Sequence, residues 1–419
     1  MNAVRTLTFA LALAFAAQAP ADYLPAPAAA EAALWASPMV MQARGEFAAQ
    51  MFKSQGLQHG REEWTVGTDV AQRRIQTMPG DSRSEWGVAL SRPLRLPARA
   101  AADRALAGAL TAHAEANLGE ALHESGRQLL ALWFDWLGEA SQELLWQAQR
   151  DLAEQQLATV NARIRLGEAP RAERVNAEAA LAQVRLQQQQ SATRAQQARS
   201  RLLAHYPALA VKADGGLPPP APPAGSAEAY VEAVLEHNHE LARARRQAEA
   251  LQAEARQLGR RRGVDPSVGV FYKSEAGGDE RVLGLSVGLT LPGAARRTDQ
   301  QAAGQLSATA QEAAAQLEQR LRQEARADFE TAVAQAADWQ QAERAAQALE
   351  ESARLAERAY GLGEGSLDQV LLTRRLALEG WVQARQAQVV ALAADARLKL
   401  DAHQLWPLDV GADDAHAHP

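Results

Sequence analysis

The chain of 419 residues contains no cysteine. It therefore forms no disulfide, offers no thiolate to a metal ion and carries no lipid on an N-terminal cysteine. Aromatic residues make up only 5% of the sequence, and alanine supplies much of the 47% that is hydrophobic. This composition favours long packed helices over a single thick core.

Signals for nucleic-acid binding, catalysis and helical membrane spans are also absent. The formal net charge of −6 gives no reason to expect nucleic-acid binding. The sequence has no nucleophile-elbow motif, no phosphate-binding loop and no His-Glu-x-x-His motif, so we expect neither enzyme activity nor a cofactor. Beyond the N-terminal segment, no apolar run approaches the roughly 18 residues that a membrane-spanning helix needs.

Residues 1–21 have the pattern of a signal peptide. Arg5 supplies the positive charge, Leu7 to Ala17 form an apolar run too short to span a bilayer, and Ala19-Pro20-Ala21 matches a cleavage site that leaves Asp22 as the mature start. An uncleaved anchor is the alternative. In either case the protein leaves the cytoplasm.

The stretch from Val282 to Gly365 dominates the organisation of the chain. Apolar residues alternate with small or polar ones from Leu283 to Leu291, which is the period of a strand. After Pro292-Gly293 comes a proline-free segment rich in helix formers, which extends to about Tyr360. A continuous helix of this length would measure about 100 Å. The glycines from Gly361 to Gly365 end it.

A similar stretch occurs earlier in the chain. Pro97 and Pro292, each preceded by leucine, lie 195 residues apart. Gly167 and Gly363, each inside a Leu-Gly-Glu triplet, lie 196 residues apart. Because the two landmarks keep the same spacing to within one residue, we infer a tandem duplication. The alternative is two unrelated helices rich in alanine and glutamine.

The duplication predicts the order of the elements. After the signal peptide, residues 22–213 form the first repeat, 214–226 a linker rich in proline and glycine, 227–403 the second repeat and 404–419 a C-terminal tail. In the first repeat we expect an extended segment over 22–37, a helix from about 39 to 58, a hairpin over about 63–95, a long helix over 98–165, a tip turn over 166–170 and a return helix over 171–203. In the second repeat we expect a helix over 227–262, a hairpin over 264–291, a long helix over 294–360, a tip turn over 361–366 and a return helix over 367–403.

The first long helix carries an apolar stripe with spacings of four and seven, which predicts coiled-coil-like packing. Its members are Leu118, Leu122, Leu129, Trp133, Leu137, Leu144, Ala148 and Leu152.

The strands have the length and pattern of transmembrane barrel strands. Each is about ten residues long, which suffices for a tilted strand to cross a bilayer. One side is apolar and the other small or polar, and Trp64, Trp86 and Tyr272 suit interfacial aromatic girdles. Arg92 falls on the apolar side, which counts against immersion as far as that point. Four strands cannot close a barrel, so several chains would have to share one. The alternative is a small soluble sheet that caps a helical rod.

The repeated order of hairpin, very long helix, glycine break and return helix resembles the TolC-like outer membrane factor family over essentially the whole mature chain. The residues that carry the resemblance are the two strand exits, Leu94-Arg95-Leu96-Pro97 and Leu289-Thr290-Leu291-Pro292, and the two breaks, 165–170 and 360–366.

The resemblance implies a mainly α fold with a small β part, in which long α-helical coiled-coil hairpins accompany four strands per chain. It further implies a homotrimer whose strands form a 12-stranded outer-membrane β-barrel and whose helices form a tunnel across the periplasm. The glycine breaks would lie at the periplasmic tip and contact a periplasmic membrane fusion (adaptor) protein coupled to an inner-membrane RND pump. The implied contact residues are Leu166, Gly167, Glu168, Leu362, Gly363, Glu364, Gly365 and Ser366.

The family often carries an acidic residue six positions after the tip glycine, facing the pore. The matching positions are Glu173 and Gln369, with Asp368 adjacent, so the second repeat departs from the pattern. A ring of carboxylates at a narrow pore would favour cations. The alternative for Glu173 is a solvated glutamate that the helix dipole favours in a first turn.

The Gly-Glu-x-Ser/Pro form of the breaks resembles the heavy-metal (CzcC/CusC-like) branch and implies export of heavy-metal cations. Drug efflux or type I secretion through the same duct is one alternative, and a soluble periplasmic coiled-coil scaffold is another. Metal binding is a further hypothesis for three groups of residues: His237-Asn238-His239, His416-Ala417-His418, and Asp413 with Asp414. Two histidines at this spacing point to opposite sides of a helix, so we expect no metal site at His237 and His239.

Overall fold

The computed structural model describes residues 23–60, 62–74, 82–211 and 216–408. The signal peptide, the turn at 78–81, part of the linker and the histidines and aspartates of the tail lie outside the described residues. The chain forms two compact units. Among the described residues, unit 1 comprises 23–33, 131–221 and 338–392, and unit 2 comprises 34–130, 222–337 and 393–408.

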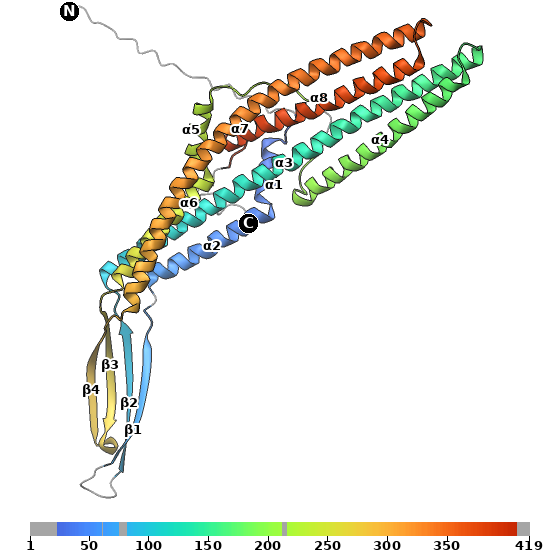
Figure 1. Cartoon of the computed structure of the whole chain (residues 1–419). Helices are drawn as coiled ribbons and strands as arrows, with labels where there is room; N and C mark the ends of the chain where they lie inside the picture. Colours follow the sequence, from blue (N-terminus) through green and yellow to red (C-terminus); the bar gives the residue numbers. More distant parts are fainter. Residues whose placement is uncertain (1–22, 61, 75–81, 212–215, 409–419) are drawn as a thin grey trace, which may run out of the picture. The chain divides into compact units, whose positions relative to one another are not determined.

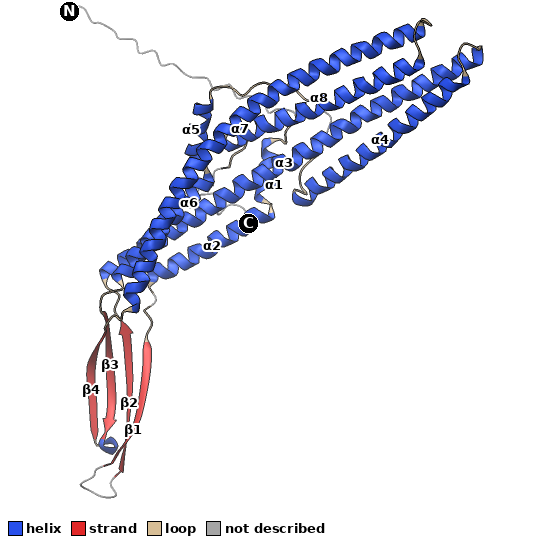
Figure 2. Ribbon diagram, in the orientation of Figure 1, coloured by secondary structure: helices blue, strands red, loops and turns tan. Residues whose placement is uncertain are grey.

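The described residues are mainly helical and include four strands (Figures 1 and 2). In chain order the elements are α1 (Pro27–Trp35), α2 (Pro38–His59), β1 (Thr65–Arg74), β2 (Ser82–Pro93), α3 (Pro97–Leu166), α4 (Arg171–His205), α5 (Ala227–His237), α6 (His239–Arg260), β3 (Asp265–Glu275), the 3-10 turn η1 (Ala276–Gly278), β4 (Glu280–Thr290), α7 (Ala295–Gly361) and α8 (Leu367–Asp401). None of the described helices contains an apolar stretch that would carry it across a membrane.

Two parts of the sequence-based assignment are wrong. Residues 22–37 are not extended throughout, because Pro27 opens helix α1. Proline is tolerated in a first helical turn, where its missing N–H would have no partner, and the alanines that follow favour a helix. The helix expected over 227–262 is two helices, because the side chain of Asn238 caps α6 by accepting a hydrogen bond from the Leu241 N–H at 2.7 Å.

Unit 1 contains two helical hairpins, α3 with α4 and α7 with α8 (Figure 1). Both turns end their first helix in the same way. Gly167 has φ +79° and Gly363 has φ +78°. The N–H of Glu168 bonds to the carbonyl of Arg163, and the N–H of Glu364 bonds to that of Ala359, each at 2.9 Å. With the shorter-range bonds from the two glycine N–H groups, this is the Schellman motif, which favours glycine at its left-handed position.

The two hairpins of unit 1 pack against each other near these turns. Val160 of α3 and Ala177 of α4 share a buried cluster with Tyr360, Leu367 and Val370 of the second hairpin. A few kcal/mol of apolar burial therefore joins the hairpins beside their exposed tips.

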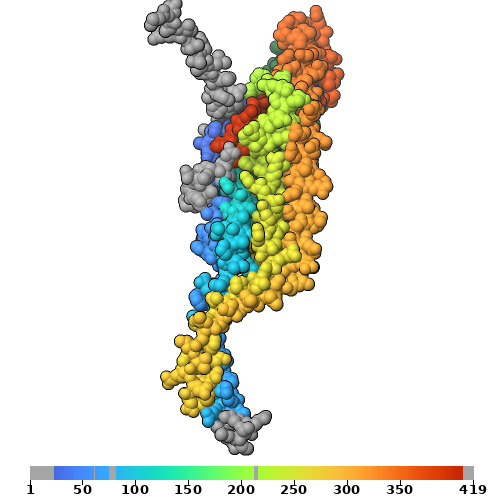
Figure 3. Space-filling model, turned by 90° about the vertical axis from the view of Figure 1, so that its left-hand side faces the viewer, coloured from blue at the N-terminus to red at the C-terminus, as the bar shows by residue number. Residues whose placement is uncertain are grey.

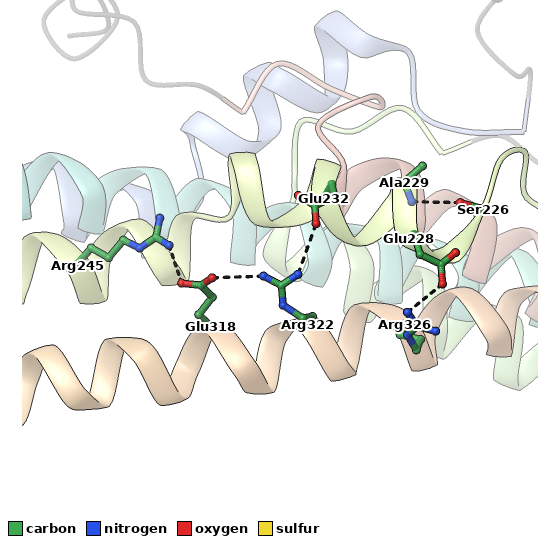
Figure 4. A network of polar contacts seen from close by, with 8 residues as sticks. All are labelled: Ser226, Glu228, Ala229, Glu232, Arg245, Glu318, Arg322 and Arg326. Carbon is green, nitrogen blue, oxygen red and sulfur yellow. Dashed lines mark hydrogen bonds and ion pairs between the residues drawn. The ribbon is translucent and has the colours of Figure 1, made fainter.

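In unit 2 the helices α5 and α6 lie along α7. Val231 and Val234 pack on Ala325, while Phe329 and Ala332 pack on Leu398 of α8. Figure 4 shows a row of ion pairs beside this seam, in which Arg245, Glu318, Arg322, Glu232, Arg326 and Glu228 link the three helices. These exposed pairs each contribute little energy, but their spacing favours one register of α5 and α6 on α7.

A buried ion pair lies in the same unit. The Asp401 carboxylate accepts a hydrogen bond from Arg127 at 2.9 Å and lies 3.3 Å from His123 Nε2. Burial alone would raise the pKa of the Asp401 carboxyl. The hydrogen bond to His123 and the charge of Arg127 outweigh this effect and hold the pKa below its ordinary value. The pair therefore contributes stability above the ordinary carboxyl pKa of about 3.9.

The sheet belongs to unit 2 and has the order β1-β2-β3-β4, with every neighbouring pair antiparallel. It projects from the end of the unit where β2 leads into α3 and β4 leads into α7 (Figure 2). The space-filling view shows the β3–β4 hairpin in yellow beside the β1–β2 hairpin in blue (Figure 3).

The two tip glycines are expected to tolerate alanine poorly although space is available. No atom lies within 4 Å of a Cβ built at Gly167 or Gly363, so Gly167→Ala and Gly363→Ala should each cost about 1–2 kcal/mol through backbone strain alone. Gly45→Ala in α2 is the matched control, because Gly45 is helical and equally unhindered. It should stabilise by about 0.5–1 kcal/mol. The measurement is the unfolding temperature of each of the three variants relative to the wild type. Equal shifts in unfolding temperature for all three would contradict the turn assignment.

Asp401→Asn is expected to destabilise the protein by about 3 kcal/mol, because it leaves the largely buried Arg127 charge with only the more distant and more exposed Glu124 as an acidic partner. The control is Asp395→Asn at a partly exposed pair with Lys399, where a change below about 1 kcal/mol is expected. At neutral pH the Asp401→Asn variant should unfold at a lower temperature than the wild type. This difference should shrink as pH falls through the lowered folded-state pKa, where Asp401 itself becomes protonated. A difference that grows on acidification would contradict the ion-pair account.

Candidate functional site

The sheet separates its side chains into two chemically different faces. Strand pairing places Val66 beside Leu90, Leu90 beside Val270, and Val270 beside Leu285. The same face carries most of the other large apolar residues of the strands: Val70, Trp86, Val88, Val268, Tyr272, Leu283, Val287 and Leu289. We call this the apolar face. It continues without a break across all four strands.

The opposite face carries mostly small and polar residues. Across it run Gly67, Ala89, Phe271 and Gly284 in one row, and Ser91, Gly269 and Ser286 in another. Close packing requires several of these glycines. A Cβ on Gly284 would lie 2.4 Å from the Phe271 ring, and one on Gly269 would lie 2.8 Å from the carbonyl oxygen of Leu90.

The apolar face is exposed. Leu283 and Leu285 of β4 are 81% and 82% exposed, and Val66, Val70, Val287 and Leu289 are also mostly exposed. A contiguous apolar surface of this kind on a folded chain marks a contact with a membrane or another protein. The strands are 10 to 12 residues long, sufficient to cross a bilayer when tilted.

Both outer strands of the sheet have one neighbour each within the described chain, β2 for β1 and β3 for β4. Their outer edges therefore present backbone N–H and carbonyl groups that another strand can bind. Water can satisfy these groups, but hydrocarbon cannot. If the apolar face lay in a nonpolar solvent, the two open edges would need additional strands.

The predicted tip residues lie at the two exposed turns of unit 1. Leu166 is 72% exposed and Leu362 is 71% exposed, and Glu168, Glu364 and Ser366 are also exposed. A Cβ on Gly365 would lie 3.1 Å from the backbone N of Tyr360, so this turn also needs glycine for close approach. The duplicated landmarks of the sequence thus form two similar surfaces, each with a solvent-exposed leucine.

The three residues expected at the pore constriction lie near one another at the contact between the hairpins. The Tyr360 hydroxyl of α7 donates a hydrogen bond to Glu173 of α4, and Asn176 of α4 donates one to Asp368 of α8 at 3.0 Å. The backbone N–H of Gln369 donates to the Ser366 hydroxyl, 3.2 Å away, which caps α8.

Glu173 therefore has a defined partner rather than only solvent. Arg163 lies over the Tyr360 ring, 4.4 Å from its centroid. Burial and the hydrogen bond to Glu173 raise the pKa of Tyr360 to about 12, so the hydroxyl remains a donor at physiological pH. Sequence reasoning missed Tyr360, Arg163 and Asn176, because these contacts join helices that are far apart in the chain.

Four histidines form a cluster in unit 2 that the sequence did not predict. The His403 ring, in the turn after α8, lies 4.8 Å from His239, 5.4 Å from His237 and 5.7 Å from His123, measured between centroids. The expectation that His237 and His239 share one helix is wrong, because Asn238 separates α5 from α6. Within the part of the chain that the structure describes, no three His, Cys, Asp or Glu side chains are arranged to hold a metal ion.

Comparison by sequence finds no matching protein-family model and no matching curated protein. Comparison by structure finds strong similarity to outer-membrane channels. The channel OprN matches with a TM-score of 0.72 over 88% of both chains at 17% identity. The Campylobacter jejuni CmeC channel matches with a TM-score of 0.72 over 93% of this chain and 89% of CmeC, at 11% identity.

CusC, whose structures describe folding and transmembrane channel formation, matches with a TM-score of 0.66 over 90% of this chain and 91% of CusC, at 13% identity. These scores do not single out CusC, so they give no preference for the heavy-metal branch. The three matches cover 88% to 93% of this chain. The chain therefore has the fold of the TolC-like outer-membrane channels.

Proposed function

We propose that this chain is the outer-membrane channel component of a tripartite, RND-type efflux system, and that it exports heavy-metal cations. The observation that carries the channel proposal is the uncovered apolar face, which runs across four strands of membrane-spanning length and ends at two open edges. Three copies would join edge to edge into a 12-stranded barrel, so that every strand gains a second neighbour and the apolar face contacts lipid.

The helical parts support a duct rather than an isolated membrane anchor. Leu144 is 54% exposed although it belongs to the apolar stripe of α3, whereas Leu118, Leu122 and Leu129 are buried within the chain. A neighbouring helix from another copy would cover such a residue. The exposed leucines at the two tips suit a periplasmic adaptor, which would connect the duct to an inner-membrane pump.

The metal proposal rests on the Gly-Glu-x-Ser and Gly-Glu-x-Pro forms of the two turns and on the carboxylates near them. Glu173 and Asp368 are held by Tyr360 and Asn176 at the hairpin contact. Carboxylates fixed near a pore mouth favour cations over anions.

A substitution on each face of β4 tests the membrane proposal. Leu285→Arg places a charge on the apolar face near the middle of the strand and should cost about 2–4 kcal/mol in a bilayer. Ser286→Arg adds the same charge on the opposite face, which would line a polar lumen, and should be tolerated. The measurement is the fraction of protein recovered as a heat-modifiable barrel in the outer membrane.

The soluble-scaffold alternative predicts a different result for this pair. Leu285 is already 82% exposed, so in water the arginine would be harmless at either position. Equal recovery of both variants, together with extraction of the wild type without detergent, would contradict the channel proposal.

A susceptibility panel on a deletion strain tests the cargo. Loss of the protein should lower resistance to zinc, cobalt, cadmium or copper and leave drug resistance unchanged, with plasmid-borne wild type restoring growth. Increased sensitivity to drugs alone would assign the duct to drug efflux instead. Single-channel conductance of the purified protein checks separately that a pore forms.

A further inference from the structure

We propose that an arginine collar, formed by Arg92, Arg260, Arg262 and Arg297, binds the phosphate of anionic phospholipid headgroups at the membrane surface. The inference rests on the proposed function, because it requires the apolar face to lie in a bilayer. The four residues lie where strands meet helices: Arg92 near the end of β2, Arg260 and Arg262 at the end of α6, and Arg297 in the first turn of α7.

The collar lies where the apolar face ends. In β2 the apolar face runs through Trp86, Val88 and Leu90, and the next position on that face is Arg92, opposite Val268 of β3. The exposed apolar row of β4 extends to Leu289, and Leu291 beyond it is also exposed. The chain then changes within a few residues from apolar to basic side chains, as it would on leaving a hydrocarbon layer for headgroups.

The end of α6 and the start of α7 lie side by side, which brings their arginines together. Arg296 donates to the carbonyl oxygen of Arg261 at 2.8 Å, and Arg262 donates to the Gln300 side chain at 2.8 Å. Arg260, Arg262 and Arg297 are all exposed. These three side chains are therefore exposed at the same junction of α6 and α7 and are accessible to a ligand.

The collar arginines differ from their neighbours in having no acidic partner. At the same junction Arg95 pairs with Asp103, and both Arg99 and Arg296 pair with Asp265. Within the described residues, none of the four collar side chains forms an ion pair. At the other end of the sheet, by contrast, Arg73 pairs with Glu85 at 2.6 Å.

The helix that begins at the collar also lacks the usual acidic residue. The first turn of α7 contains Arg296 and Arg297 and no acidic side chain. Free backbone N–H groups give a helix N-terminus a partial positive charge, so arginine there is unfavourable by a few tenths of a kcal/mol or more unless an anion is present. Asp265 pairs with Arg296, so Arg297 is the arginine of this turn that a further anion would stabilise.

A phospholipid headgroup fits the site better than a soluble anion, because it is the anion that a membrane places at the end of an apolar surface. One guanidinium group can donate two parallel hydrogen bonds to two oxygens of the same phosphate. Arg92 lies over the ring of Trp64, 5.4 Å from its centroid. Tryptophan is enriched at headgroup depth in membrane proteins, so the stacked pair marks that level.

The test compares lipid binding by the full chain and two triple variants. Arg260, Arg262 and Arg297 are replaced by glutamine in one variant. In the control, Arg199, Arg344 and Arg358 are replaced, since these exposed arginines also form no ion pair in the described chain and the net charge changes equally. Native mass spectrometry in detergent measures the relative affinity for phosphatidylglycerol and phosphatidylcholine. Insertion into phosphatidylcholine vesicles checks that each variant folds.

The wild type and the control should prefer phosphatidylglycerol, and the collar variant should lose roughly five-fold in this preference for each arginine removed. Lysine at the same three positions should restore part of it. Equal lipid preference in wild type, collar variant and control would overturn the inference while leaving the channel intact. Displacement of the lipid by inorganic phosphate would also overturn it, because the site would then bind any phosphate. Failure of the wild type to insert into vesicles of either lipid would overturn the channel proposal and this inference with it.

Discussion

Backbone groups at the edge of a sheet must form hydrogen bonds, and apolar side chains must leave water. The sheet of this chain leaves both needs unmet, since β1 and β4 each have one neighbour and the apolar face is uncovered. Within one copy in water, the edges can be hydrated but the apolar face cannot be buried. Within one copy in lipid, the face is satisfied but the edges are not, at a cost of several kcal/mol per group. Assembly of several copies in a membrane satisfies both.

In the proposed duct, long rigid helices would extend from the membrane. The helices α3 and α7 have 70 and 67 residues, respectively. Each helix reverses at a glycine with positive φ, and the two reversals have the same hydrogen-bond pattern. The contact of Glu173 with Tyr360 and of Asn176 with Asp368 then fixes one hairpin against the other beside the tips.

The sequence predicts most of what depends on local pattern. Period-two alternation identified the strands and their two faces, and the glycines at 167 and 363 marked both turns, because these signals depend on neighbouring residues. The missed features depend on distant ones. The apolar stripe of α3 is buried at Leu118, Leu122 and Leu129, but Leu144 of the same pattern is exposed, since burial depends on what packs opposite. The histidine cluster joins α3, α5, α6 and the turn after α8, which no spacing in the sequence connects.

Edge-to-edge assembly can be measured directly, because the chain contains no cysteine. Each variant carries two introduced cysteines, one on the outer edge of β1 near Thr68 and one on the outer edge of β4 near Val287. A panel of such pairs samples different strand registers. Within one copy two intervening strands separate these edges by about 14 Å, beyond the roughly 7 Å that a disulfide spans between Cα atoms. Any disulfide must therefore join different copies. The account predicts that at least one register in the panel gives covalent trimers from the outer membrane. Exclusively monomeric protein across the whole panel, with the thiols reactive to water-soluble reagents, would contradict it.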